Sequence, residues 1–221
     1  MSRRTWWIAG GLLALLVAGL VAGPLVYAAL QEDAPAAQTV EVQPEGVELS
    51  EETDGTWTVG DGSSAGYRVD EVLNGADVTV AGTTDQVNGT LVVKGGDLAE
   101  GEVAVDVASI STDSGRRDSY FRDSVMDVAQ YPTAMFTVAG PVDLPELSGT
   151  PVTVPVNGEL TVAGSAQPVQ FELSVVRTSD GVDVSGSIPL TFADFGIEAP
   201  NLGFVSVEDQ GSVEFLLHLA M

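Results

Sequence analysis

Apolar and polar residues alternate along most of the chain after residue 55, in short runs that turn signals separate. Apolar residues, with an occasional glycine, occupy every second position at 154–162, 169–175, 182–188 and 213–219. Successive side chains of a strand point to opposite faces, so a period of two predicts strands with one buried face.

Six earlier runs also have strand character, at residues 56–59, 64–73, 76–81, 86–94, 102–107 and 133–139. Turn signals such as Asn74-Gly75 separate them, and the proline-rich residues 141–151 predict a connection. About eight to ten strands with almost no helix predict an antiparallel barrel or sandwich. Strand glycines such as Gly158 and Gly186 fit the bends of a closed barrel.

The alternation stops at residues 109–136, where helical spacing replaces it. Three apolar residues recur at i, i+4 and i+7, namely Phe121, Val125 and Val128. Gly115 before them and Pro132 after them act as helix breakers. The spacing predicts one short helix that covers an end of the barrel, either simply docked on the core or gating a ligand cavity.

The polar side of this predicted helix holds a cluster of basic residues. Arg116, Arg117 and Arg122 lie among aspartates, and Asp118 is spaced to pair with Arg122 one turn later. An exposed pair of this kind contributes only about 0 to 1 kcal/mol. We therefore expect packing of the apolar face, and not ion pairing, to hold the helix down.

The N-terminus has the pattern of a membrane anchor. Arg3 and Arg4 precede an uncharged run at residues 6–30, which as a helix would span about 37 Å, against a hydrocarbon core of about 30 Å. Basic residues before the run place the following domain on the extracytoplasmic side. A cleaved signal peptide, releasing a secreted domain, is the alternative.

These patterns divide the chain into three parts. Residues 1–30 are the expected single-pass anchor in the cell membrane, residues 31–54 an acidic and flexible linker, and residues 55–221 the barrel domain. The linker assignment follows from its abundance of Glu, Pro, Ala and Gln without a sustained period.

Composition narrows the chemistry. The formal net charge of −24 opposes binding to nucleic acids, and the absence of cysteine excludes disulfides and thiolate metal sites. His218, the only histidine, alternates with two leucines and should point away from the apolar face. We find no catalytic motif, metal-binding loop or cofactor motif, and expect a binding protein and not an enzyme.

The large apolar residues suggest a ligand cavity. Many lie on the inferred inner faces, where they either fill the core or line a cavity, since a barrel of about eight strands can hold one ligand. The expected lining residues are Tyr67, Phe121, Met126, Phe136, Phe171, Phe192 and Phe215.

Four stretches together resemble the YceI-like family of bacterial lipid-binding proteins. They read SSAGYRVDE, VNGTLVV, VDVASISTDSGRRDSYFR followed by YPTAMF, and GELTVAGSAQPVQFEL. The most specific parts are the R-R-D-x-x-x-R segment, the Y-P-x-x-x-F element and the later L-T-x-x-G-x-x-x-P-V element. The family's motif positions fall here on Arg117, Asp118, Arg122, Tyr131, Pro132 and Phe136.

The resemblance implies an extended, lipocalin-like antiparallel barrel whose interior holds a long polyisoprenoid or similar amphiphile. It also implies that the motif positions mark the fold and the docking of the helix more than ligand contact. We thus expect a membrane-tethered carrier of an isoprenoid lipid. The alternative is a cell-surface structural or interaction domain without a ligand.

Overall fold

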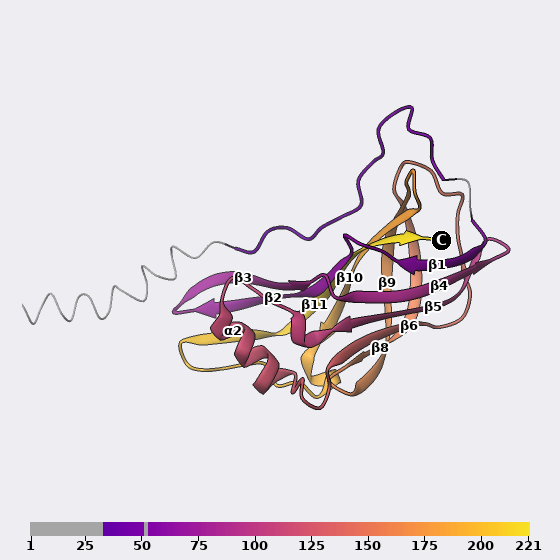
Figure 1. The fold of residues 1–221 in the computed structure, drawn as a ribbon. Helices are drawn as coiled ribbons and strands as arrows, with labels where there is room; N and C mark the ends of the chain where they lie inside the picture. The colour runs from indigo at the N-terminus through magenta and orange to yellow at the C-terminus, as the bar shows by residue number, and fades with distance from the viewer. Residues whose placement is uncertain (1–32, 51–52) are drawn as a thin grey trace, which may run out of the picture.

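The computed structural model describes residues 33–50 and 53–221 (Figure 1). The predicted membrane anchor at residues 1–30 lies outside the described residues. Within the described part, no helix is both long enough and apolar enough to cross a membrane.

Strands make up most of the described chain. They are β1 (Gly55–Val59), β2 (Ser64–Leu73), β3 (Ala76–Thr84), β4 (Val87–Lys94), β5 (Asp97–Asp106), β6 (Thr133–Val138), β7 (Val142–Asp143), β8 (Val152–Val162), β9 (Ser165–Arg177), β10 (Val182–Thr191) and β11 (Val205–Ala220). Each predicted run of strand character corresponds to one of these. The two differences are the short β7, inside the predicted connection, and β11, which begins eight residues before the predicted run because its first half alternates poorly.

The strands close into an antiparallel barrel. Their order is β1-β4-β5-β6-β8-β9-β10-β11, and β1 pairs again with the end of β11 through Thr58 and Val59. Closure removes the free sheet edges that an open sandwich would leave. The predicted barrel of about eight strands is therefore confirmed.

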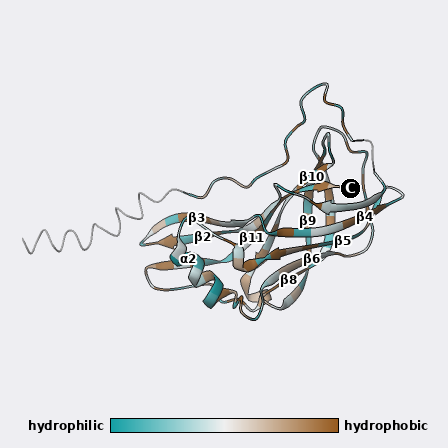
Figure 2. Ribbon diagram, in the orientation of Figure 1, coloured by the Kyte–Doolittle hydropathy of each residue, from teal (hydrophilic) through white to brown (hydrophobic). Residues whose placement is uncertain are grey.

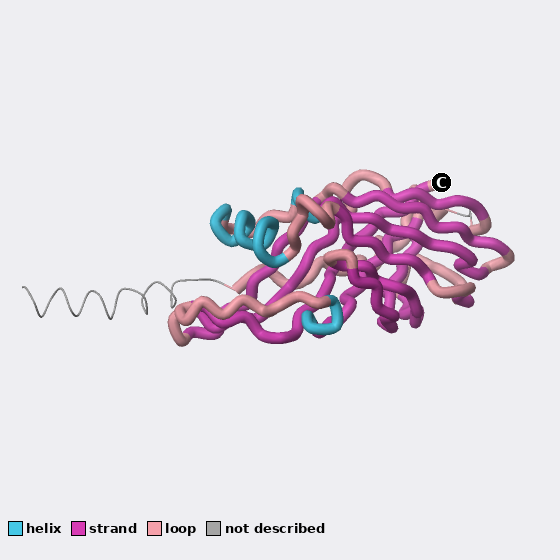
Figure 3. Tube along the Cα trace, turned by 90° about the horizontal axis from the view of Figure 1, so that it is seen from below, coloured by secondary structure: helices cyan, strands magenta, loops and turns pink. Residues whose placement is uncertain are grey.

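The β2–β3 hairpin extends the barrel at one end. β2 pairs with β11 from Val205 to Leu216, with a bulge between Val207 and Gly211. One edge of β11 therefore pairs first with β2 and then, at its last residues, with β1. The barrel is thus split at this end, where β3 ends the strand order and is bridged at Thr83 to Ser111. Figure 3 shows the helical segment across the split end, far from the C-terminus.

The helical segment begins with the 3-10 turn η1 (Val107–Ser109) and continues as α2 (Gly115–Tyr120) and the π-helical turn η2 (Phe121–Val125). The Ser114 hydroxyl accepts a hydrogen bond from the backbone N–H of Arg117 and caps α2. Gly115, predicted to break the helix, is therefore its first residue. The predicted apolar face, which includes Phe121, packs on the core.

Asp118 bonds to Thr112 and not to Arg122, with which its spacing would allow an ion pair. Asp118 is buried, and its carboxylate accepts hydrogen bonds from the backbone N–H and the hydroxyl of Thr112, at 2.9 and 2.7 Å. The helix turns Asp118 towards the preceding loop, so this carboxylate ties the helix to that loop.

Residues 33–50, which we call the strap, lie against the outside of the barrel and do not form the free tether expected from composition. The backbone N–H of Val40 donates to the Ser185 hydroxyl of β10, and Val40 itself is buried. Farther along, the N–H of Ser50 donates to the carbonyl of Thr178. Figure 1 shows the strap running from β3 towards the opposite end of the barrel.

Apolar side chains from the predicted inner faces form the core of the barrel, and Figure 2 shows the hydrophobic residues along the strands that carry them. Two of the strand glycines make room for aromatic rings: a Cβ on Gly158 would lie 2.2 Å from the Phe136 ring, and one on Gly186 would lie 2.7 Å from the Phe215 ring. Close packing, in addition to bending, accounts for these glycines.

His218 lies on the outer surface, as the alternation predicts. Its neighbours Leu217 and Leu219 are buried, and its Nδ1 lies 2.7 Å from a carboxylate oxygen of Asp183 on β10. The cross-strand register places these two residues opposite each other. The sequence did not predict this pair, because it depends on which strands are neighbours.

Candidate ligand cavity

The interior of the closed barrel holds an apolar cavity of about 580 Å³, which we call the barrel chamber. Inward-facing residues of the barrel strands form its wall, and the apolar residues Leu144 and Leu147 lie over its far end. Protein interiors are normally packed with few voids larger than a water molecule. A chamber of this size therefore falls in the range of ligand pockets, about 300 to 1,000 Å³.

A second cavity, of about 900 Å³, lies at the split end and is called here the helix-end chamber. Its walls come from β2, the helical segment and residues 197–205. Its rim includes Tyr120, Leu202 and Phe204, which are all exposed large hydrophobic residues. The chamber therefore reaches the molecular surface at an apolar rim.

The two chambers meet at a waist of small and medium side chains. Ala65, Val105, Ala134 and Val213 line both cavities. Because these four residues come from β2, β5, β6 and β11, the waist lies where the hairpin leaves the barrel. The two chambers are therefore neighbours, and only these four side chains lie between them.

Three of the predicted lining residues lie in the barrel chamber. Phe171 is central: its ring meets Phe136 at 5.3 Å and Phe215 at 6.1 Å, both edge to face. Such pairs add about 0.5 to 1.5 kcal/mol to the burial of the rings. The cluster thus forms a rigid aromatic wall.

The other four predicted lining residues, Tyr67, Phe121, Met126 and Phe192, lie in the helix-end chamber. The rings of Tyr67 and Phe121 stack at 4.7 Å, which joins β2 to the helical segment. Burial raises the pKa of the Tyr67 hydroxyl to about 12, and the nearby Arg117 guanidinium opposes this rise. The hydroxyl therefore stays neutral at physiological pH.

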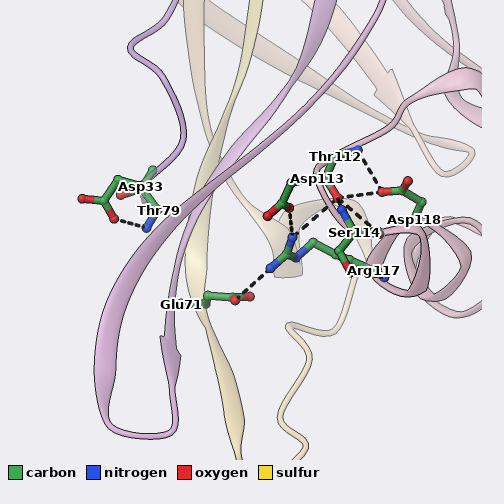
Figure 4. Close-up of polar contacts among 8 residues, drawn as sticks. All are labelled: Asp33, Glu71, Thr79, Thr112, Asp113, Ser114, Arg117 and Asp118. Atoms are coloured by element: carbon green, nitrogen blue, oxygen red, sulfur yellow. Dashed lines mark hydrogen bonds and ion pairs between the residues drawn. The ribbon is translucent and has the colours of Figure 1, made fainter. Parts of the chain in front are cut away.

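A group of charged side chains, which includes Glu71, Asp113 and Arg117, lies in the helix-end chamber (Figure 4). Their charges act on Tyr67. Arg117 forms an ion pair with the buried Glu71 of β2, at 3.4 Å, and a second one with Asp113. The guanidinium thus joins the helical segment to the β2–β3 hairpin. No group of side chains suited to a metal ion occurs in the described ranges 33–50 and 53–221.

The sequence matches a known family of domains. A YceI-like domain model matches residues 57–219, which is most of the chain. The chain belongs to the YceI-like family.

Solved structures share the fold of this YceI-like barrel. A polyisoprenoid-binding domain from Saccharophagus degradans, implicated in plant cell wall breakdown, superposes with a TM-score of 0.60 at 19% identity, covering 74% of this chain and 97% of its own. BcnA of Burkholderia cenocepacia superposes with a TM-score of 0.58 at 19% identity, covering 72% and 96%. No curated protein matches the sequence significantly.

The YceI-like motif positions at the end of the helical segment hold the fold together. Tyr131 packs over the β8–β9 turn, where a Cβ on Gly164 would lie 2.3 Å from its ring. The carbonyl of Pro132 accepts the backbone N–H of Val107, and the carbonyl of Arg122 accepts that of Val128. Neither Tyr131 nor Pro132 lines a chamber, whereas Phe136 does.

Sequence reasoning missed Glu71 as a cavity residue. The sequence did indicate it, because Glu71 follows Tyr67 and Val69 at a spacing of two and therefore faces inward with them. A carboxylate at an inward position of a strand requires a partner. That partner, Arg117, comes from 46 residues away, and only the folded chain brings it there.

Proposed function

We propose that this YceI-like protein is an extracytoplasmic, membrane-tethered carrier that holds a long-chain isoprenoid lipid in its two joined chambers, without covalent chemistry. The observation that carries the proposal is the waist. Four residues line both cavities there, so the cavities are neighbours. A long flexible hydrocarbon that passes between these side chains would use both cavities, whereas a compact ligand would use only one.

The energetics favour a hydrocarbon ligand. Each methylene group moved from water into an apolar wall stabilises the complex by about 0.8 kcal/mol before entropic costs. The fold shared with the polyisoprenoid-binding domain of Saccharophagus degradans supports an isoprenoid as that hydrocarbon.

The position of the strap supports a tether at the open end. The uncharged run ends at residue 30, and Asp33 shortly after it accepts the backbone N–H of Thr79 on β3. β3 lies beside the helical segment, at the end where the helix-end chamber has its apolar rim (Figure 1). An anchor that enters there turns the rim towards the bilayer, from which the lipid would be taken.

Mass measurement tests lipid binding. The full chain, purified from membranes in mild detergent and examined by native mass spectrometry, should carry an added mass that organic extraction releases as an isoprenoid. Delipidated protein should regain thermal stability on addition of geranylgeraniol. A chain that never carries added mass and is not stabilised by any isoprenoid would contradict the proposal and favour a structural or interaction domain.

Protease digestion of intact spheroplasts tests the location separately. The barrel should be degraded from outside while a cytoplasmic marker is protected. Protection of the barrel together with the marker would contradict the extracytoplasmic placement and leave lipid binding untouched.

A further inference from the structure

The helix-end chamber contains a polar corner, formed by Tyr67, Glu71, Asp113 and Arg117, within walls that are mostly apolar. An apolar chain needs no such group, and burying charged side chains is unfavourable unless they are paired. The corner lies near the exposed rim and not in the barrel chamber. It is therefore placed to meet the polar end of a ligand whose hydrocarbon chain extends through the waist.

The cation of the corner is already neutralised. Glu71, whose side chain is 6% exposed, holds one side of the Arg117 guanidinium, and Asp113, 61% exposed, holds the other. Arg117 also donates towards the Thr112 hydroxyl at 3.5 Å. Two carboxylates thus share one half-buried guanidinium. Arg116, the other cation in the chamber lining, is exposed, and solvent screens it.

The Tyr67 hydroxyl is the neutral hydrogen-bonding group of the corner. It forms no hydrogen bond with any residue in the described part of the chain. Every fully buried polar side-chain atom in that part has a hydrogen-bond partner. The Tyr67 hydroxyl has none, so it is not fully buried but opens to the chamber that it lines. It is free to donate to, or accept from, a group on a ligand.

These observations favour a neutral head group over a phosphate. A phosphate carries about −1.5 to −2 charges near neutral pH. In the corner it would meet Glu71 and Asp113 at close range and would have to displace one of them from Arg117. A hydroxyl or carbonyl group needs only one hydrogen bond and brings no charge.

We propose that the polar corner binds the neutral, hydrogen-bonding head group of an isoprenoid, with Tyr67 as the contact, and that Glu71 excludes phosphorylated isoprenoids by neutralising Arg117. This inference rests on the proposed lipid carrier function. It adds the chemical class of the ligand and names one residue that determines specificity.

Three probes of similar chain chemistry test the inference on the delipidated full chain in detergent: geranylgeraniol, geranylgeranyl monophosphate and the hydrocarbon squalene. The wild type should bind the alcohol roughly tenfold or more tightly than the phosphate. Glu71→Gln should tighten phosphate binding roughly ten- to hundredfold, the range of one charge-assisted hydrogen bond. Tyr67→Phe should weaken binding of the alcohol roughly threefold to tenfold and leave the affinity for squalene unchanged.

Glu100→Gln is the matched control, because Glu100 forms an exposed ion pair with Lys94 outside both chambers. It should leave all three affinities unchanged. Wild-type protein that binds the phosphate as tightly as the alcohol would overturn the inference, and this comparison needs no variant to fold. An unchanged ratio in a folded Glu71→Gln protein would also overturn it. If none of the three probes binds, squalene included, the result would instead contradict the carrier function.

Discussion

At the scale of single residues, Tyr67 shows how the interior changes the chemistry of one side chain. Its ring stacks on Phe121, and burial raises the pKa of its hydroxyl to about 12 from the usual 10.0. The folded protein therefore keeps a proton that the unfolded chain releases about two pH units earlier. The stability contributed by this neutral hydroxyl is fully present below pH 10 and is lost as the pH rises towards 12.

The alkaline titration of the protein should show this effect. The phenolate absorbance of the wild type should contain a step near pH 12 that is missing in Tyr67→Phe, and alkaline loss of stability should be smaller in the variant by on the order of 2 kcal/mol. A step that survives in Tyr67→Phe would assign the raised pKa to another tyrosine. Equal alkaline stability of the two proteins would contradict the linkage.

At the scale of elements, the strap is held by a few specific contacts and not by regular pairing along its length. Val40 is the one buried hydrophobic residue of the strap, at 8% exposure, and its backbone N–H bonds to Ser185. Val42, two residues later, is 65% exposed. The strap thus reaches the barrel at single positions such as Val40, although its composition resembles that of a disordered linker.

Substitution of Val40 and of Val42 should distinguish a docked strap from a free linker. Val40→Asp should release the strap, raise its sensitivity to proteases and lower the free energy of unfolding by about 1 to 2 kcal/mol, since a buried valine side chain is lost from the interface. Val42→Asp introduces the same charge at an exposed position and should change neither quantity. Limited proteolysis and thermal unfolding measure both, and equal behaviour of the two variants would contradict a docked strap.

At the scale of the whole molecule, the fold combines a closed end with an open one. Pairing of β1 with β11 closes the barrel, while the β2–β3 hairpin diverges and leaves space that the helical segment covers. The aromatic cluster around Phe171 walls the closed end, and the polar corner lies at the open one. If the protein carries a long isoprenoid, as we propose, the waist between them sets how long a ligand the interior accepts.

Ala134→Trp should divide the interior at the waist. The added indole would occupy the passage, so a long isoprenoid should lose at least about tenfold in affinity, while a short one that fits a single chamber should bind nearly as before. Ala166→Trp, at an exposed position of β9, is the control and should affect neither. Fluorescence titration with chains of different length measures this, and equal loss for short and long chains would argue against two joined chambers.

Much of the fold was predictable because alternation acts locally. The predicted inner faces of β8, β9 and β10 were correct. All seven predicted lining residues lie on chamber walls, and their contact with a ligand stays a prediction. The orientation of Asp118 was not predictable, because its partner Thr112 belongs to the irregular loop before the helix. The docking of residues 33–50 was missed because composition alone does not reveal a complementary surface.

The sequence by itself determined which side chains point inward, since neighbouring residues of a strand must face opposite ways whatever the strand pairs with. It also determined the family, through motifs that lie close together in the chain. Only the tertiary structure decided that the interior is two chambers joined at a waist, and that Glu71 and Arg117 meet inside one of them. Those features depend on how the barrel closes and where its hairpin diverges, and no local pattern carries that information.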